Sequence, residues 1–280
     1  MLPTRSIDCT VFQGRTGDHN DLAMPGAGAV GMALARRVGT APVTIGTPEP
    51  ATRADWRAQL ELARPALTQL QSRIADVLSR GALSITTMGR CAAAMATLPA
   101  VVQHNPDVCI VWFDAHADLN TPEASTTGYL GGLALAAPAG LWNSGLGQGV
   151  ELGQIILVGQ RDLDPFESDL IAKHGIPHIT PGFNLTTELR LAIAGRPVYV
   201  HLDCDVLTPG IVPTDYSVEG GLSLADLHVC CSVIADHFFI GLEIAEFQIA
   251  WTNGGDPVSP EPLLAALEPL LGPAATLPTT

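Results

Sequence analysis

Basic residues are scarce in this chain. Its 280 residues include 14 Lys and Arg against 28 Asp and Glu, a net charge of −14, and charged residues make up only 15% of the total. A surface with this excess of negative charge repels nucleic acids and anionic membranes, so neither is an expected partner. No apolar run approaches the ~18 residues of a membrane-spanning helix, and no signal peptide is visible. These features predict an intracellular, cytoplasmic protein.

The sequence also lacks a disulfide framework. Six cysteines are present, and most of them lie within apolar runs, which is typical of reduced thiols in a protein core. Hydrophobic residues make up 47% of the sequence, enough to fill a large core, and neither an internal repeat nor a long linker divides the chain. We therefore expect one domain over residues 1–280, with a mobile tail at residues 273–280.

Apolar runs of strand length alternate with helical patterns along the chain. Strands are expected at residues 6–12, 82–86, 108–113, 154–158, 198–202 and 238–244. Helices are expected at residues 26–38, 52–78, 92–103 and 260–271, with a further helix that ends at residue 235. This alternation predicts a three-layer α/β/α fold around a mostly parallel sheet.

Two of the expected strands lead directly into metal-capable side chains. One is followed by Asp114, His116 and Asp118, and the other by Asp203 and Asp205. Because ligands bind at the carboxyl edge of parallel sheets, and because side chains alternate along a strand, these residues are expected to meet at one site. Without a cation, such carboxylates would repel one another and raise their own pKa values. Oxygen-rich ligation with one imidazole favours Mn(II) over a structural zinc.

The two motifs resemble signatures of the arginase, or ureohydrolase, family of dinuclear manganese hydrolases. They read Phe113-Asp114-Ala115-His116-Ala117-Asp118-Leu119-Asn120 and His201-Leu202-Asp203-Cys204-Asp205, and the likeness runs from about residue 6 to residue 271. The resemblance implies an arginase-like sheet of about eight strands. It also implies two Mn(II) ions per chain, which would activate a water molecule for attack on the guanidino carbon of a small amino-acid substrate.

The resemblance assigns the metal ligands residue by residue. Asp114 and Asp203 would bridge the two ions, Asp118 and Cys91 would complete the first site, and His116 and Asp205 the second. Cys91, within Met88-Gly89-Arg90-Cys91, stands where most of the family has the histidine of Gly-Gly-Asp-His. A thiolate is softer than imidazole and matches Mn(II) less well, so that site is expected to be weaker or altered in preference. The alternative is an inert buried cysteine at the start of a helix.

Catalytic and substrate-binding residues follow from the same resemblance. Asp118 would also orient the attacking water and pass on its proton, and Glu246 would hold the guanidino group. The residues implied to bind the α-carboxylate and the α-ammonium of the substrate are Asn120, Thr127, Asp164 and Glu167. Asp164 and Glu167 are alternatively explained as acids favoured at a helix N-terminus. The segment Asp18-His19-Asn20 is explained either as part of the site or as loop polarity, and we favour loop polarity.

A second departure from the family pattern concerns the substrate. Gly131 stands where a proton-transferring histidine is usual. N-hydroxylation lowers the basicity of a guanidine, so Nω-hydroxy-L-arginine would be largely neutral near neutral pH and easier to attack without that histidine. We therefore predict hydrolysis of Nω-hydroxy-L-arginine to L-ornithine and hydroxyurea, and the chain most resembles family members with this substrate. The alternatives are an ordinary arginase, another guanidino- or formimidoyl-amino-acid hydrolase, and a catalytically silent protein with the same fold.

Overall fold

One parallel sheet of eight strands forms the centre of the protein. The structure, a computed structural model, describes residues 5–272. The strands are β1 (Ile7–Phe12), β2 (Val43–Ile45), β3 (Leu83–Met88), β4 (Cys109–Phe113), β5 (Ile155–Val158), β6 (His178–Ile179), β7 (Val198–Asp203) and β8 (Phe239–Ala245). Their spatial order is β2-β1-β3-β8-β7-β4-β5-β6, and every pairing is parallel.

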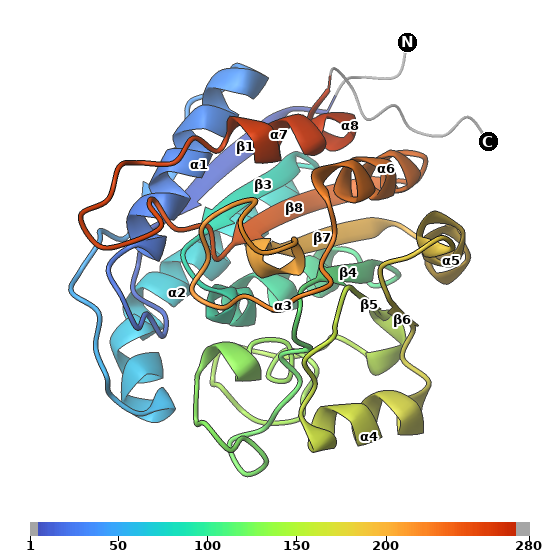
Figure 1. Ribbon diagram of the computed structural model, residues 1–280, viewed down its shortest axis with the longest axis horizontal. Helices are drawn as coiled ribbons and strands as arrows, with labels where there is room; N and C mark the ends of the chain where they lie inside the picture. Colours follow the sequence, from blue (N-terminus) through green and yellow to red (C-terminus); the bar gives the residue numbers. More distant parts are fainter. Residues whose placement is uncertain (1–4, 273–280) are drawn as a thin grey trace.

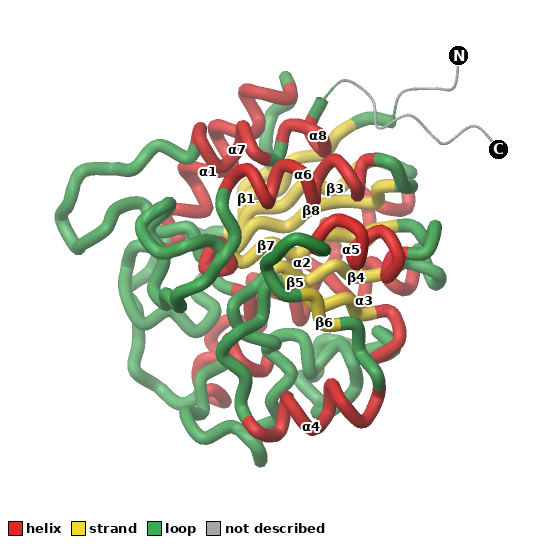
Figure 2. The backbone as a smooth tube through the Cα atoms, turned by 45° about the vertical axis from the view of Figure 1, so that its right-hand side comes forward, coloured by secondary structure: helices red, strands yellow, loops and turns green. Residues whose placement is uncertain are grey.

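Helices cover both faces of this sheet (Figures 1 and 2). The helices are α1 (Ala23–Val38), α2 (Trp56–Ser79), α3 (Ala94–His104), α4 (Pro165–His174), α5 (Leu185–Ile193), α6 (Leu224–Ala235), α7 (Glu261–Ala266) and α8 (Glu268–Leu271). One hydrophobic cluster joins α1, α5, α6, α7 and α8 to one face of the sheet, and a second joins α2, α3 and α4 to the other. The three-layer α/β/α prediction is confirmed.

The central strands read as continuous apolar runs because they are buried on both faces. Every residue of β4 is 0% exposed, for example, and all six residues of β7 are buried. Such runs are typical of parallel strands that lie between two helical layers. All six strands expected from the sequence are present, with boundaries that differ by at most two residues.

The structure corrects three details of the sequence prediction. The short strands β2 and β6 were not predicted. They lie at the two edges of the sheet, where each pairs with a single neighbouring strand. The single helix expected at residues 260–271 is two helices, α7 and α8, separated at Leu267. Pro269 lies in the first turn of α8, and because proline has no N–H group it cannot continue the hydrogen bonding of α7.

Two further predictions concern the extent and the setting of the chain. The tail expected to be mobile, residues 273–280, lies outside the described residues. Within residues 5–272, no helix combines the length and the apolar character that crossing a membrane requires.

Candidate metal centre and substrate pocket

Five neighbouring strands carry the candidate site at their carboxyl ends. In spatial order, β3 leads into Cys91, β8 into Glu246, and β7 into Asp203 and Asp205. The next strand, β4, leads into Asp114, His116 and Asp118, and β5 leads into Asp164 and Glu167. Because the strands are parallel, all these ends lie at one edge of the sheet. Residues far apart in the chain therefore meet, as Cys91 and Glu246 do across 155 positions.

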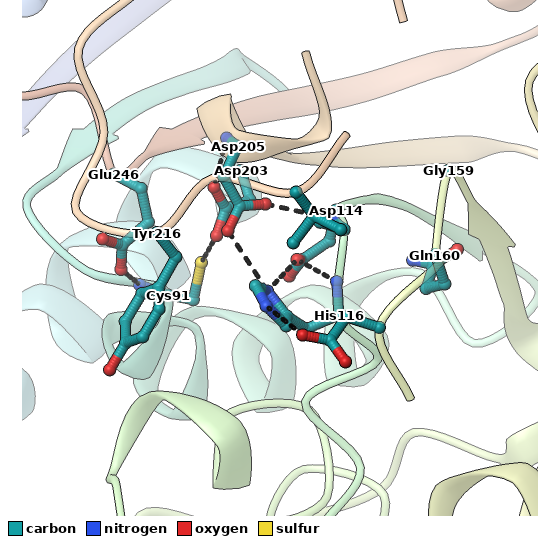
Figure 3. Close-up of polar contacts among 12 residues, drawn as sticks. Cys91, Asp114, His116, Gly159, Gln160, Asp203, Asp205, Tyr216 and Glu246 are labelled. Carbon is teal, nitrogen blue, oxygen red and sulfur yellow. Dashed lines mark hydrogen bonds and ion pairs between the residues drawn. The ribbon is translucent and has the colours of Figure 1, made fainter. Parts of the chain in front are cut away.

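Asp114, His116 and Asp205 form what we call the imidazole side of the site (Figure 3). The His116 Nδ1 atom lies 3.3 Å from Asp114 Oδ1 and 3.1 Å from Asp205 Oδ2. Backbone amides hold both carboxylates, since His116 N donates to Asp114 Oδ1 at 2.7 Å and Ala115 N donates to Asp205 Oδ1 at 3.0 Å. The His116 side chain is 27% exposed, so this side is open to solvent.

Cys91, Asp203 and Glu246 form the thiol side. Cys91 Sγ donates to Asp203 Oδ2 at 3.0 Å, and the Cys91 backbone N donates to Glu246 Oε1 at 3.2 Å. All three residues are buried, with Cys91 only 2% exposed. Asp203 Oδ1 in turn accepts a hydrogen bond from Asp205 N at 2.7 Å. Asp203 therefore connects the two sides, which is where a bridging ligand would lie.

Asp118 and Glu246 share an unusual backbone conformation. Their φ angles are 53° and 64°, in the left-handed region, and they are two of the three non-glycine residues with positive φ in the described part of the chain. Such a conformation costs on the order of 1–3 kcal/mol and persists where the surrounding structure enforces it, as at active sites. The two residues expected to act in catalysis are thus the ones that follow β4 and β8 in a strained turn.

Charge is compensated differently on the two sides. On the thiol side, burial raises the pKa of Cys91 and of Asp203 well above the usual values, and neighbouring carboxylates add to the effect. Burial likewise raises the pKa of Glu246 to about 7, in spite of a nearby guanidinium. On the imidazole side burial acts against protonation of His116, but hydrogen bonds to Asp114 and Asp205 raise its pKa well above the usual value.

The residues present fit a pair of divalent cations. Three groups of ligand atoms each lie within 4.8 Å of one another, namely Cys91, Asp114 and Asp118; Cys91, Asp203 and Glu246; and Asp114, His116 and Asp205. Oxygen atoms dominate, with one imidazole and one thiol, a donor set suited to a first-row divalent ion. Two such ions would neutralise the negative charge on Asp114, Asp118 and Asp203, whose pKa values are raised by burial and by neighbouring carboxylates.

A cavity of about 220 Å³ opens beside both sides of the site. Its wall includes Cys91, His116, Asp118, Asn120, Thr127, Asp164, Glu167, Asp203, Asp205 and Glu246. Of the residues expected at the site, Asp114 alone does not line the cavity, since its carboxylate is 0% exposed behind them and accepts a hydrogen bond from Trp112 Nε1 at 3.0 Å. The structure therefore brings all the expected site residues together.

The four residues expected to bind the amino-acid part of the substrate lie along one stretch of this wall. Asn120 Nδ2 donates to Asp164 Oδ2 at 2.8 Å. Glu167 accepts hydrogen bonds from Leu119 N at 2.9 Å and from Asp164 N at 3.0 Å, and burial raises its pKa to about 7. Thr127 Oγ1 accepts a hydrogen bond from Tyr129 N at 3.2 Å. Glu167 lies in the first turn of α4, so it is both a helix N-terminal acid and part of the cavity wall.

A buried polar chain behind Cys91 was not found by sequence reasoning. His201 Nε2 lies 3.2 Å from Cys91 Sγ, and His201 Nδ1 lies 2.7 Å from Glu243 Oε1. Glu243 Oε2 also accepts hydrogen bonds from Thr97 Oγ1 at 2.6 Å and Tyr199 Oη at 3.0 Å. All these groups are buried. One signal was available, because His201 lies two positions before Asp203 on the same strand and so faces the same way.

The space beside Gly131 is taken up by the side chain of Tyr129. A Cβ atom on Gly131 would lie 2.4 Å from Cε1 and 3.0 Å from the hydroxyl oxygen of Tyr129. The Tyr129 ring, packed against His19 with 4.5 Å between ring centroids, therefore fills the volume that a side chain at position 131 would need. The glycine at position 131 therefore goes together with Tyr129, a residue that sequence reasoning did not identify as part of the site.

The interpretation of Asp18 as loop polarity is wrong. Asp18 is 0% exposed and accepts a hydrogen bond from Arg90 Nε at 3.1 Å, so it is part of a buried ion-pair network. Arg90, also 0% exposed, donates through Nη1 to Glu246 at 2.8 Å. The sequence could not reveal this pairing, because the partners lie on separate loops that meet only at the sheet edge.

Comparisons with known proteins point to one family. The profile described as "Arginase family" matches residues 16–255. The N(omega)-hydroxy-L-arginine amidinohydrolase of Streptomyces lavendulae is 37% identical over 242 residues, which cover 86% of this chain and 89% of that protein. The structure of arginase from Bacillus subtilis has a TM-score of 0.81 at 21% identity, covering 96% of this chain and 99% of that one. Entamoeba histolytica arginase in complex with L-ornithine gives a TM-score of 0.81 at 22% identity, with 96% and 100% covered.

Proposed function

The chain belongs to the arginase family, and from this premise we propose that it hydrolyses Nω-hydroxy-L-arginine to L-ornithine and hydroxyurea with two Mn(II) ions. The observation that carries the choice of substrate is the pair of departures at the amidino end of the cavity. Cys91 supplies a thiol where the family has an imidazole, and Tyr129 occupies the place of a histidine at position 131. The N(omega)-hydroxy-L-arginine amidinohydrolase of Streptomyces lavendulae, which is 37% identical to this chain, supports the choice.

Two of the three groups of ligand atoms support a ligand assignment, one with Cys91, Asp114 and Asp118 and one with Asp114, His116 and Asp205, whereas the third joins Cys91 and Asp203 to Glu246. Asp114 and Asp203 would be shared by the ions, Cys91 and Asp118 would belong to one, and His116 and Asp205 to the other. Bound ions would neutralise the carboxylates and lower the pKa of a water molecule between the two sides. His116 would bind as a neutral imidazole, so occupation of the site would release the proton that the metal-free protein holds there.

The protein groups would do the remaining chemistry. Asp118, on the cavity wall and held in a left-handed turn, would orient the water and accept its proton. Glu246 would hydrogen-bond the amidino nitrogens. Water would add its oxygen to the amidino carbon, and the bond from that carbon to the side-chain nitrogen of the nascent ornithine would break. The leaving nitrogen takes up the proton, which gives ornithine and hydroxyurea.

The test combines metal analysis with product analysis. Protein stripped by a chelator and reloaded with Mn(II) is expected to bind two ions per chain and to give a higher kcat/KM for Nω-hydroxy-L-arginine, with hydroxyurea as product, than for L-arginine, with urea as product. The Asp118→Asn variant should lose turnover. Asp169→Asn, the same change at an exposed residue of α4, is the matched control and should keep it.

Two outcomes would overturn the proposal in different ways. A kcat/KM that favours L-arginine would replace the hydroxylated substrate with arginine and leave the hydrolase intact. Failure to bind metal together with no turnover of either compound would mean that the carboxylates no longer serve catalysis, as in a catalytically silent member of the fold.

A further inference from the structure

Glu246, the carboxylate proposed to face the amidino group, is already paired within the protein. Its Oε2 atom accepts a hydrogen bond from Arg90 Nη1 at 2.8 Å, and its Oε1 atom accepts from Cys91 N at 3.2 Å. Glu246 nevertheless lies on the cavity wall (Figure 3). A ligand in the cavity therefore meets a carboxylate whose negative charge is already opposed by a protein guanidinium.

Arg90 is held in this position from three directions. It pairs with Asp18 through Nε at 3.1 Å and with Asp215 through Nη1 at 2.8 Å, in addition to Glu246. The Arg90 and Asp18 side chains are both fully buried. A guanidinium stays charged in proteins, and withdrawal of a buried one would leave three carboxylates without their partner. The positive charge of Arg90 is thus a fixed part of this end of the site.

That charge affects two ligands in opposite ways. L-arginine brings a guanidinium of the same sign as Arg90 to the same carboxylate, and juxtaposed like charges in a desolvated site are costly. A hydroxyguanidine is less basic and arrives largely neutral, so it can hydrogen-bond to Glu246 without that repulsion. Discrimination by an unfavourable contact to the wrong ligand is a general route to specificity.

We infer that Arg90 determines substrate specificity by pairing with Glu246, so that the cavity selects a neutral hydroxyguanidine over a guanidinium cation. The inference rests on the proposed function, because it names what distinguishes the two substrates at the same site. Arg90 does not line the cavity. It therefore acts through Glu246 and is a positioning residue rather than a catalytic one.

The test compares ligand binding in two variants whose effects should have opposite signs. Calorimetry at saturating Mn(II) in the Asp118→Asn background, which should turn over neither compound, gives the Kd of L-arginine and of Nω-hydroxy-L-arginine, and their ratio is the preference. In Asp18→Asn/Arg90→Met, which removes one charge of each sign, the preference for the hydroxylated ligand should fall by about tenfold to a hundredfold, mainly through tighter binding of L-arginine. In Asp18→Asn alone, Arg90 loses one counter-charge, so the preference should rise.

The matched control applies the same double change to another ion pair. Arg73 and Asp8 pair at 2.6 Å between α2 and β1, away from the cavity, and Asp8→Asn/Arg73→Met should leave the preference at the wild-type value. Arg90→Lys keeps a positive charge and should keep most of the preference. Melting temperature and Mn content of each variant report separately on folding and metal loading.

Three results would overturn the inference. They are an unchanged preference in Asp18→Asn/Arg90→Met, a change of the same sign in both Asp18 variants, and an equal change in the Arg73 control. The proposed substrate is tested apart from this, by the wild-type ratio alone. Wild-type protein that prefers L-arginine would overturn the substrate, whereas the role of Arg90 is decided by the change between variants.

Discussion

The two sides of the metal site are built differently. On the imidazole side, His116 is 27% exposed, and its outer nitrogen lies 4.0 Å from the exposed Asp162. On the thiol side, Cys91 is 2% exposed, and behind it His201 and Glu243 form a hydrogen-bonded chain into the core. The side with the poorer ligand for a hard cation is therefore the more tightly constructed one. Groups behind a metal ligand fix its orientation and tune the metal, so this buried chain supports the proposal that Cys91 is a ligand.

Asp203 is the residue that joins the two sides, and its replacement should have the largest effect. In Asp203→Asn the side chain keeps its size and can still accept from Asp205 N, now 2.7 Å from Oδ1, but an amide nitrogen replaces the oxygen that accepts from Cys91 Sγ at 3.0 Å, and the shared negative charge is lost. We expect kcat/KM to fall by at least about a thousandfold, because both ions would lose a ligand. Metal content and turnover check this, with Asp169→Asn as the control. Two ions per chain and wild-type turnover in Asp203→Asn would show that the sides are independent.

Removal of metal should expose the difference in charge compensation. The pKa of Glu246 on the thiol side is raised by burial from 4.5 to about 7. A raised carboxyl pKa stabilises the fold below the unfolded-state value and loses that contribution as pH rises to the folded-state value. In metal-free protein, Glu246 alone should therefore contribute a loss of about 3 kcal/mol between pH 4.5 and 7, which corresponds to a fall of roughly 6–12 °C in Tm. With saturating Mn(II) this decrease of Tm with pH should vanish or reverse, because the ligands bind the metal in their deprotonated form.

Thermal melting in chelator and in Mn(II) across that pH range measures both slopes. The Glu246→Gln variant lacks the titrating group and should show a shallower slope in the metal-free state. A metal-free Tm that rises through this range would contradict the sign of the argument.

Glu243 tests whether the chain behind Cys91 supports the metal site. In Glu243→Gln the side chain still accepts hydrogen bonds from Thr97 and Tyr199, but the charge that faces His201 Nδ1 at 2.7 Å is removed. Loss of such a supporting group typically weakens metal affinity by about 10- to 100-fold. We expect the weaker of two stepwise Mn(II) affinities to fall by this amount, while the other changes little. Equal weakening of both steps would mean a general loss of structure.

The central elements of the site could be predicted because each signal is local. A buried apolar run followed at once by Asp114 and His116, or by Asp203 and Asp205, places those side chains at the sheet edge wherever the strand lies. The edge strands β2 and β6 were missed because runs of three and two residues carry too little pattern. The break between α7 and α8 was missed although Pro269 marked it.

The buried polar chain behind Cys91 could not be predicted because it depends on the register between neighbouring strands. Trp112 is paired with His201 across β4 and β7, and His201 with Glu243 across β7 and β8. Trp112 stacks on His201 with 3.5 Å between ring centroids. Three residues from distant parts of the chain thus form one row across adjacent strands. The order β8-β7-β4 is not the order in the sequence, so no local pattern contains this row.

The exposed counterpart of Glu243 should matter least. Asp162 Oδ2 lies 4.0 Å from His116 Nε2, and its side chain is 69% exposed, so water screens the interaction. Exposed ion pairs contribute about 0–1 kcal/mol, so Asp162→Asn should weaken Mn(II) affinity by roughly fivefold or less. Calorimetric titration under the conditions used for Glu243→Gln gives the direct comparison, since both variants replace one carboxylate next to a histidine. If Asp162→Asn weakened Mn(II) binding as much as Glu243→Gln does, the contribution of a carboxylate next to a histidine to metal affinity would not depend on its exposure. The contrast between the two sides would then come from the thiol and imidazole themselves.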